Sequence, residues 1–415
     1  MKSLRLSFPL YIVVAIVFFL NNIKTFAQEI KPQTQNKRAY YYFKTGQKMM
    51  DNGLFEKAEA LLTESIELRP AYLEAWNLRA TCRERLGRLD AAIRDYNQIL
   101  KMEPNRYDAL FSRSILFYET ERYPLAIEGF DQLLQTPKGE TQAVYFKGKS
   151  LNPSEETTME GIVSLNTEQG EIYHYRGLAK WKLNYLDGAI EDFTLAVEAN
   201  SQQPDYFVNR GLVYMKKKDM KAAIADMQSA LELDPENTLA LYNLSLASKN
   251  HNAALKALDE VVNLEDGFPT AYANRAYARL EIGDYRAAIN DYDTAIMLDK
   301  TQPEFFSNRG IAHKKARNYK RAIRDFSQAI VLAPSWGKNY SLRGETYFKL
   351  TEFDKAIEDF TAALAYDSNN GNYYFNRALA YRRVGENEKC CQDLQIASRL
   401  GMRQAIRAMN AYCNE

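Results

Sequence analysis

The chain has 415 residues, with 54 lysine and arginine residues against 53 aspartate and glutamate residues. This near balance argues against a protein that binds nucleic acid through a broadly basic face, because such a face gives a high isoelectric point. A hydrophobic content of 46% is too high for a disordered chain, and three histidines leave little room for a histidine-rich metal site.

The first 27 residues have the pattern of a secretory signal peptide. Two basic residues precede an apolar run at 10–20, and Thr25-Phe26-Ala27 has the small residues of a cleavage site. The apolar run is too short to cross a bilayer, which takes roughly 20 residues. We therefore expect a mature chain that starts near Gln28, a linker at 28–38, and an exported protein that is periplasmic or secreted. An uncleaved anchor is the alternative.

From residue 39 onwards, one motif returns at a regular interval. The clearest copies are YANRAYARLEIGDYRAAINDYDTAIMLD, FSNRGIAHKKARNYKRAIRDFSQAIVLAP and YSLRGETYFKLTEFDKAIEDFTAALAYD, which start at 272, 306 and 340. Each has two stretches of helical period joined by a turn. The pattern and its interval resemble the tetratricopeptide repeat. The resemblance implies an all-α fold, a right-handed α-α superhelix built from antiparallel helix hairpins. Ten copies begin at Ala39, Leu73, Tyr107, Gly170, Pro204, Thr238, Pro269, Pro303, Gly337 and Gly371.

Two positions in the second helix of each copy predict the packing. An alanine should let the two helices approach closely, and a larger side chain would hold them apart. The alanines are Ala58, Ala92, Ala126, Ala189, Ala223, Ala288, Ala322 and Ala356. A larger side chain four residues later should fill the gap between neighbouring hairpins. These side chains are Leu62, Tyr96, Phe130, Phe193, Met227, Tyr292, Phe326 and Phe360.

The copies are interrupted in one place and shortened in another. Copies one to three span 39–138, and copies four to ten span 170–404. Between them, 139–169 has two β-prone runs separated by turn formers, which favours a small β-hairpin insertion. A degenerate eleventh repeat is the alternative. The sixth copy spans only 238–268 and is shorter than its neighbours, which predicts a tightened turn between its helices.

Seven copies pair an arginine at their seventh position with an aspartate at their twenty-third. The first and sixth copies lack both residues, and the third has Arg113 opposite Gly129. This co-occurrence predicts a ladder of ion pairs that fix the hairpin geometry. A ligand-binding role for the arginines is the alternative. The pairs are Arg79–Asp95, Arg176–Asp192, Arg210–Asp226, Arg275–Asp291, Arg309–Asp325, Arg343–Asp359 and Arg377–Asp393.

Asparagine recurs at the sixth position of the later copies, where the family resemblance implies an inner helix facing a concave groove. The series looks similar to the asparagine ladder of O-linked N-acetylglucosamine transferase, whose side chains grip a peptide backbone. One amide both donates and accepts a hydrogen bond, so it can bind a backbone without reading its sequence. A merely solvated helix face is the alternative. The residues are Asn209, Asn243, Asn274, Asn308 and Asn376, with Leu342 breaking the series.

Basic and aromatic residues near the end of several first helices give a second indication of a groove. A partly basic groove with aromatic side chains would hold an acidic peptide or a C-terminal carboxylate. The alternative is a solvated charged face. The lysine and asparagine set of the carboxylate clamp, known from co-chaperones of this family, is not found. The groove residues are Trp181, Lys216, Lys314, Lys315, Phe348, Lys349, Arg382 and Arg383.

The end of the chain predicts a capping helix at 402–415, with an amphipathic stretch at 402–413. A Cys391–Cys413 disulfide would join it to the last repeat, and some relatives look similar at their ends; Cys390–Cys413 is the alternative pairing. Cys82 is expected to be a small buried residue. No Cys-x-x-Cys or histidine spacing suggests zinc, so we expect no metal and no cofactor.

No motif of a phosphate-binding loop, hydrolase elbow or zinc peptidase occurs. We therefore expect a non-catalytic scaffold outside the cytoplasm that binds another protein or a peptide and does not bind nucleic acid. After signal cleavage we expect no stable insertion into a membrane. The alternative is a subunit of an envelope or secretion complex that acts by self-association or as an accessory to an enzyme.

Overall fold

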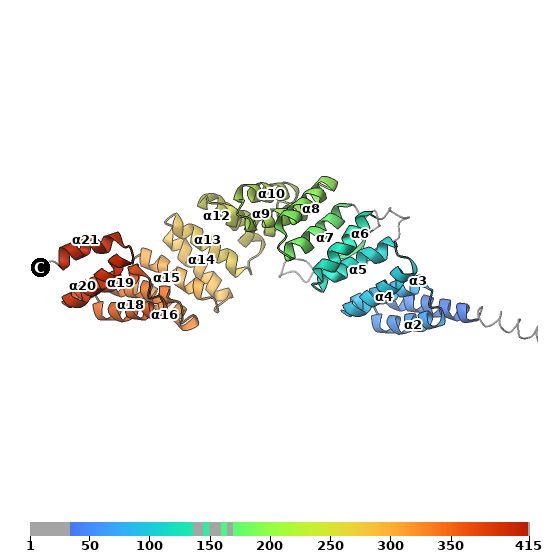
Figure 1. Ribbon diagram of the computed structural model, residues 1–415, viewed down its shortest axis with the longest axis horizontal. Coiled ribbons are helices and arrows are strands. Elements are labelled where there is room, and N and C mark those ends of the chain that lie inside the picture. Colours follow the sequence, from blue (N-terminus) through green and yellow to red (C-terminus); the bar gives the residue numbers. More distant parts are fainter. Residues whose placement is uncertain (1–33, 136–143, 149–158, 164–168, 414–415) are drawn as a thin grey trace, which may run out of the picture. The chain divides into compact units, whose positions relative to one another are not determined.

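The computed structural model describes residues 34–135, 144–148, 159–163 and 169–413 (Figure 1). The predicted signal peptide at 1–27 and much of the insertion at 139–169 lie outside the described residues. The chain divides into two compact units, with the boundary between Val213 and Tyr214.

Both units are built from antiparallel helix hairpins that follow one another along the chain, as the repeat pattern predicts. In the first unit, helical residues 34–51 are followed by α2 (Phe55–Leu68), α3 (Leu73–Arg85), α4 (Leu89–Met102), α5 (Tyr107–Glu119), α6 (Tyr123–Gln135), α7 (Gln169–Lys182) and α8 (Leu186–Ala199), and α9 (Pro204–Lys216) runs across the boundary. The second unit continues with α10 (Met220–Leu233), α11 (Thr238–Ala247), α12 (His251–Leu264), α13 (Pro269–Glu281), α14 (Tyr285–Leu298), α15 (Pro303–Lys315), α16 (Tyr319–Leu332), α17 (Gly337–Lys349), α18 (Phe353–Tyr366), α19 (Gly371–Arg383), α20 (Asn387–Arg399) and α21 (Arg403–Tyr412).

The turn inside most hairpins uses one residue with a left-handed backbone, always at the fifteenth repeat position. Glycine takes this conformation at little cost and stands there in four copies, for example Gly283 with φ of 91°. Five copies use another residue instead: Glu121, Asn184, Lys218, Arg317 and Thr351. These side chains strain the turn, so the packing of the two helices must hold the backbone in place.

The core follows the two predicted packing positions. All eight alanines of the second helices are fully buried, and the large side chains four residues later are buried with them. Glycines of the first helices complete the contact, because a Cβ added at Gly310 would lie 2.7 Å from Cε1 of Phe326. The same close approach brings Gly177 to Phe193. Each of these hairpins is therefore fixed by a small residue on one helix facing a large one on the other.

The sixth copy corrects one prediction. Its turn, residues 248–250, has three residues, as many as the turn at 282–284 in the next copy. The missing residues come from the first helix, since α11 has 10 residues where α13 has 13. The side chain of Asn250 caps α12 by accepting from the backbone of Asn252 and Ala253. Such a cap stabilises the start of α12, which favours keeping all three residues of the turn.

Two short strands lie within the segment that the sequence assigns to an insertion. β1 (Val144–Gly148) and β2 (Met159–Val163) pair antiparallel, with Val144 opposite Val163 and Gly148 opposite Met159. The residues that join the strands to each other and to α6 and α7 lie outside the described part of the chain.

The C-terminal helix α21 covers the end of the last hairpin. Ala405 is fully buried against a cluster that includes Leu394 and Ala397 of α20. A disulfide joins Cys391 to Cys413, while Cys390 is buried as a free thiol. This pairing is the one that the sequence favours over Cys390–Cys413. Cys82 is also a buried free thiol, as expected.

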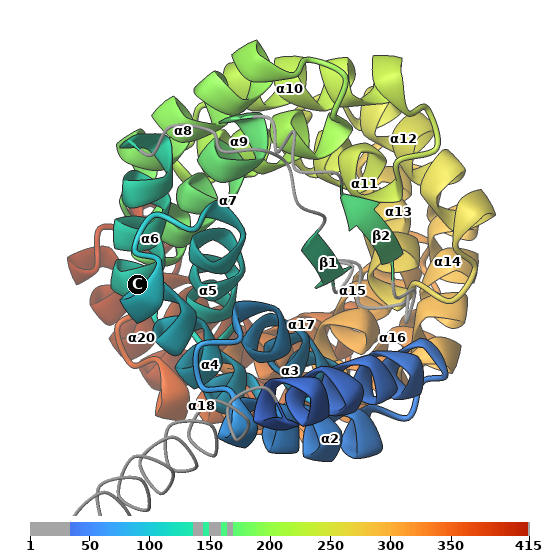
Figure 2. The same ribbon diagram turned by 90° about the vertical axis from the view of Figure 1, so that its right-hand side faces the viewer.

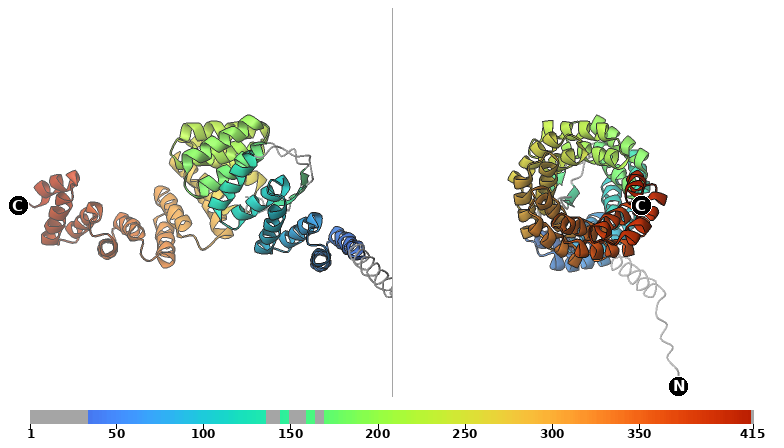
Figure 3. Two further views of the ribbon diagram at one scale, coloured as in Figure 1. Left: turned by 45° about the vertical axis from the view of Figure 1, so that its right-hand side comes forward. Right: turned by 90° about the vertical axis from the view of Figure 1, so that its left-hand side faces the viewer.

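In each unit, the first helices of successive hairpins lie on one side and the second helices on the other. α5 touches α7 in the first unit, and α13, α15, α17 and α19 touch in sequence in the second. Figure 2 shows α5 and α7 on the inner side of the first unit with α6 outside them, and α13 and α15 on the inner side of the second unit with α14 and α16 outside them. Figure 3 shows the hairpins from two further directions. No helix among the described residues is long and apolar enough to cross a bilayer.

Candidate functional site: the inner face of the hairpins

The predicted arginine–aspartate ladder is present in both units and is structural. In the second unit, Nε and Nη2 of Arg275 donate to the two carboxylate oxygens of Asp291 at 3.0 and 2.7 Å. Four other pairs have the same two-pronged geometry. They are Arg79–Asp95, Arg176–Asp192, Arg309–Asp325 and Arg377–Asp393. Arg343–Asp359 has this geometry too. In each of these six pairs, both residues belong to the same unit.

The seventh predicted pair, Arg210 and Asp226, is divided between the two units. Nη1 of Arg210 donates to Oγ1 of Thr194 at 3.1 Å, and Asp226 is buried. In the third copy, Gly129 stands in place of the aspartate, and Nη1 of Arg113 donates to Oδ1 of Asn97 at 2.9 Å. Burial lowers the pKa of Arg113, because the charged form has lost water without gaining a bonded carboxylate.

Aromatic side chains three residues before the ladder arginines complete this arrangement, and sequence reasoning missed them. The guanidinium carbon of Arg275 lies 5.4 Å from the ring centre of Tyr272. Burial alone would lower the pKa of Arg275, but the hydrogen bonds and charge of Asp291 raise it above its ordinary value. In the six pairs that form, the guanidinium contacts both an aspartate and a ring, which favours the structural role of the arginines over the ligand-binding alternative. The same stacking occurs at Trp76, Tyr173, Phe207, Phe306, Tyr340 and Tyr374.

The asparagine series divides into buried and available members. Asn209 is 2% exposed, and its Nδ2 lies 2.8 Å from Nε2 of His174. Burial lowers the pKa of His174 to about 4, so this ring is neutral and accepts the hydrogen bond. Asn243 is 6% exposed and donates to the carbonyl of Leu239 in its own helix. The prediction of free groove amides is therefore wrong for these two residues.

The other three asparagines are half-buried on the inner side of the second unit. Nδ2 of Asn274 donates to the hydroxyl of Tyr242 at 2.9 Å, which leaves its carbonyl oxygen available. Nδ2 of Asn376 lies 3.5 Å from Oε1 of Glu345, a long contact. Asn308 has no hydrogen-bond partner within the described part of the chain. Its whole amide is available to a ligand.

The residues of the predicted basic groove are in part already paired or stacked within the protein. Nζ of Lys314 pairs with Glu345 at 2.8 Å, so its charge is locally balanced. The guanidinium of Arg382 stacks on Tyr412 of the capping helix, and that of Arg383 stacks on Phe353, each at 4.8 Å. Lys216, Lys315 and Lys349 are exposed to solvent, while Trp181 and Phe348 are half-buried against their own hairpins.

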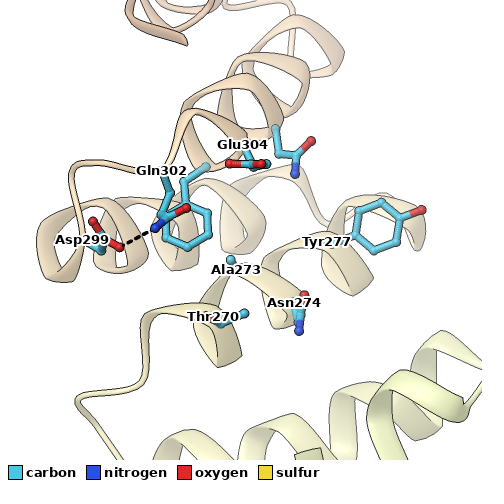
Figure 4. A pocket seen from close by; sticks show the side chains of 9 residues that line it. Thr270, Ala273, Asn274, Tyr277, Asp299, Gln302 and Glu304 are labelled. Atoms are coloured by element: carbon cyan, nitrogen blue, oxygen red, sulfur yellow. Dashed lines mark hydrogen bonds between the residues drawn. The ribbon is translucent and has the colours of Figure 1, made fainter. Parts of the chain in front are cut away.

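A pocket of about 420 Å³ opens between α13 and α15 in the second unit (Figure 4). This volume lies in the range of small-ligand sites. Thr270, Ala273 and Asn274 of α13 lie at its base in Figure 4, with Tyr277 at one end and Asp299 at the other. Gln302 and Glu304 complete the labelled walls, and Phe305 and Asn308 of α15 also line it. Asn274 and Asn308, from adjacent copies, therefore share one pocket.

Protein-family models match the chain over most of the repeats identified from the sequence. Models described as tetratricopeptide repeat match residues 43–100, 84–140, 170–203, 204–237 and 337–370, and one described as TPR repeat matches 276–316. The chain belongs to the tetratricopeptide-repeat family. It shares 28% identity over 165 residues with the human DnaJ homolog subfamily C member 7, over 35% of this chain and 33% of that protein. The chain thus spans about a third of the length of that relative.

Several solved structures are also similar to this one. A tetratricopeptide repeat protein from Parabacteroides merdae is 17% identical, with a TM-score of 0.44 over 66% of this chain and 98% of that one. YrrB, described as a tetratricopeptide-repeat protein with an unusual peptide-binding site, is 20% identical, with a TM-score of 0.39 over 44% of this chain and 97% of its own. A structure of the APC/C hetero-tetramer Cut9–Hcn1 is 14% identical, with a TM-score of 0.45 over 96% of this chain and 89% of that one.

Proposed function

We propose that this tetratricopeptide-repeat protein is a non-catalytic scaffold that binds an extended segment of another protein on the inner side of its second unit. The observation that carries the proposal is the pair formed by Asn274 and Asn308. They occupy the same repeat position in adjacent copies, line the same pocket, and keep hydrogen-bonding groups available. A peptide backbone presents both donors and acceptors, and a carboxamide matches both.

The inner side suits such a ligand for a second reason. Its helices are fixed by close-packed small and large residues and by the ion-pair ladder, so the surface is formed before the ligand arrives. A preformed surface avoids the entropy loss of ordering a flexible binder, which lets modest contacts add up to useful affinity.

The test is site-specific photo-crosslinking in the native cells. A photoreactive benzoylphenylalanine replaces Tyr277, which is 48% exposed at the pocket, and in a control it replaces Tyr185, which is 63% exposed in a turn of the first unit. We expect a defined adduct only from position 277, and we expect Asn308→Ala to remove it. Equal adducts from both positions, or an adduct that survives Asn308→Ala, would place the binding surface elsewhere.

A matched variant separates lost binding from lost folding. Asn290 and Gln328 are exposed amides on the outer helices α14 and α16. Asn290→Ala with Gln328→Ala removes two amides without touching the pocket, so its adduct at position 277 should be unchanged. An adduct between two copies of this chain would instead support the alternative of self-association in an envelope or secretion complex.

We further propose that the protein acts outside the cytoplasm, in the periplasm or as a secreted protein. The support is the N-terminal sequence pattern and the disulfide at the C-terminal cap, a bond typical of oxidising compartments. N-terminal sequencing of the protein from fractionated cells should find Gln28 first, in a soluble extracytoplasmic fraction. Intact Met1 in the cytoplasm would refute this assignment.

A further inference from the structure

We propose that the pocket between α13 and α15 selects a cationic side chain, arginine or lysine, from the segment that the inner face binds. This inference rests on the proposed function and adds the chemistry of the partner, a basic segment. It is the reverse of the acidic peptide that the sequence suggests.

The charge of the pocket lining is the first argument. Asp299 and Glu304 are acidic, and no lysine, arginine or histidine is among the nine residues that line the pocket. Hydrogen bonds from the side chain and backbone of Thr301 and from the side chain of Gln302 hold the pKa of Asp299 below its ordinary value. This carboxylate therefore remains charged at neutral pH. Glu304 is exposed in the first turn of α15.

The shape of the pocket is the second argument. Asp299 and Tyr277 lie at opposite ends of it in Figure 4, and Glu304 lies between them along the upper edge. Tyr277 is 48% exposed, and an aromatic face attracts a cation as well as apolar carbons. A long basic side chain can therefore lay its methylene groups along Tyr277 and Phe305 while its charged end reaches a carboxylate.

The surroundings of the predicted basic positions are the third argument. Lys314, in the same helix as Asn308, is already paired with Glu345 of α17. An acidic ligand would have to break that pair, and in the pocket itself it would meet two like charges. A basic ligand meets neither cost, since both pocket carboxylates lack a salt bridge to the described residues.

The experiment compares three synthetic nonapeptides with the sequence Ser-Ala-Ser-Ala-X-Ala-Ser-Ala-Ser and blocked ends. X is arginine, glutamate or citrulline, which has the shape of arginine without its charge. Binding to the protein, purified as its cells process it, is followed through the side-chain amide resonances of Asn274 and Asn308, assigned with the two alanine variants. Exposed charge pairs and one cation–π contact predict about three- to tenfold tighter binding of the arginine peptide than of the citrulline peptide.

Variants of the carboxylates locate the effect. Asp299→Asn keeps an oxygen for the Thr301 turn, and Glu304→Gln keeps the side-chain length, so the double variant removes charge with little change of shape. It should lower the affinity for the arginine peptide to that for citrulline. Glu281→Gln, an exposed acid at the end of α13 outside the pocket, should preserve the preference.

The other outcomes refute either the preference for a cation or the proposed binding site. If the three peptides bind equally and Asn308→Ala abolishes binding, the preference for a cation is refuted and the peptide-binding scaffold stands. If arginine is preferred but the double variant keeps that preference, the cation is recognised elsewhere and the inference fails. If no peptide shifts either asparagine up to millimolar concentration, both this inference and the proposed site are refuted.

Discussion

Removing the carboxylate of Asp291 tests whether the ion-pair ladder stabilises the array. Asp291 accepts from Arg275 at 2.7 and 3.0 Å and from Arg279 at 2.7 Å, and its side chain is 6% exposed. Asp259 contacts the same two arginines but is 49% exposed. Asp291→Ala and Asp259→Ala therefore each remove one carboxylate from the same two arginines, a buried carboxylate in the first variant and a half-exposed one in the second.

The magnitudes differ because burial decides what a lost partner costs. Breaking a buried ion pair destabilises by about 3–5 kcal/mol, since the remaining charge stays buried without compensation. Arg275 retains Asp259 at 2.9 Å, which places Asp291→Ala near the lower end, at about 3 kcal/mol. An exposed pair is worth about 0.2–1 kcal/mol, which is the loss expected for Asp259→Ala.

Urea unfolding followed by far-ultraviolet circular dichroism would measure both losses, and hydrogen exchange at α13 and α14 would localise them. Local exchange matters because repeat arrays can unfold in parts. A loss below about 1 kcal/mol for Asp291→Ala, the range of an exposed pair, or equal losses for the two variants, would show that the ladder is incidental to stability.

Three further predictions concern packing, titration and the cap. Gly310→Ala should destabilise the protein by about 1–3 kcal/mol, because the added Cβ would meet the buried ring of Phe326. Gly267→Ala, in an open turn, should change thermal stability little. Equal melting temperatures for the two variants would contradict this prediction. Burial raises the pKa of Glu84 from its ordinary 4.5 to about 7, so the folded state holds a proton that the unfolded chain releases. Stability should then fall as pH rises from about 4.5 to about 7, and Glu84→Gln should flatten this slope in a pH series of unfolding curves; unchanged slopes would refute it. Cys413→Ala opens a cross-link over 22 residues and should cost about 3 kcal/mol, seen as faster hydrogen exchange confined to α20 and α21; unaltered exchange there would show that the cap holds without it.

The packing of each hairpin could be predicted from the sequence because it is local. Ala288 and Tyr292 are four residues apart on one helix. Ala288 shares a buried cluster with Leu280 of the first helix of the same copy, and Tyr292 shares one with Ala276. The ring of Tyr292 also lies in one cluster with Phe305 of the next copy, so it fills the gap between neighbouring hairpins as well. The ladder pairs such as Arg275–Asp291 join two positions of one copy for the same reason. Repetition of such short-range patterns within the chain identifies both the contact and its partner without any knowledge of how copies stack.

The state of each asparagine was decided only by the tertiary structure. All five occupy the same repeat position, yet their surroundings differ. Asn209 is buried and donates a hydrogen bond to His174 of the preceding copy, and Asn274 donates one to the hydroxyl of Tyr242. Asn308 has no hydrogen-bond partner among the described residues. The position within a copy is set by helical period, but the neighbour comes from the preceding copy, and the copies differ at that point. The acidic lining of the pocket has the same origin: Asp299 belongs to the loop between two copies, and packing of α13 beside α15 brings it to the asparagines.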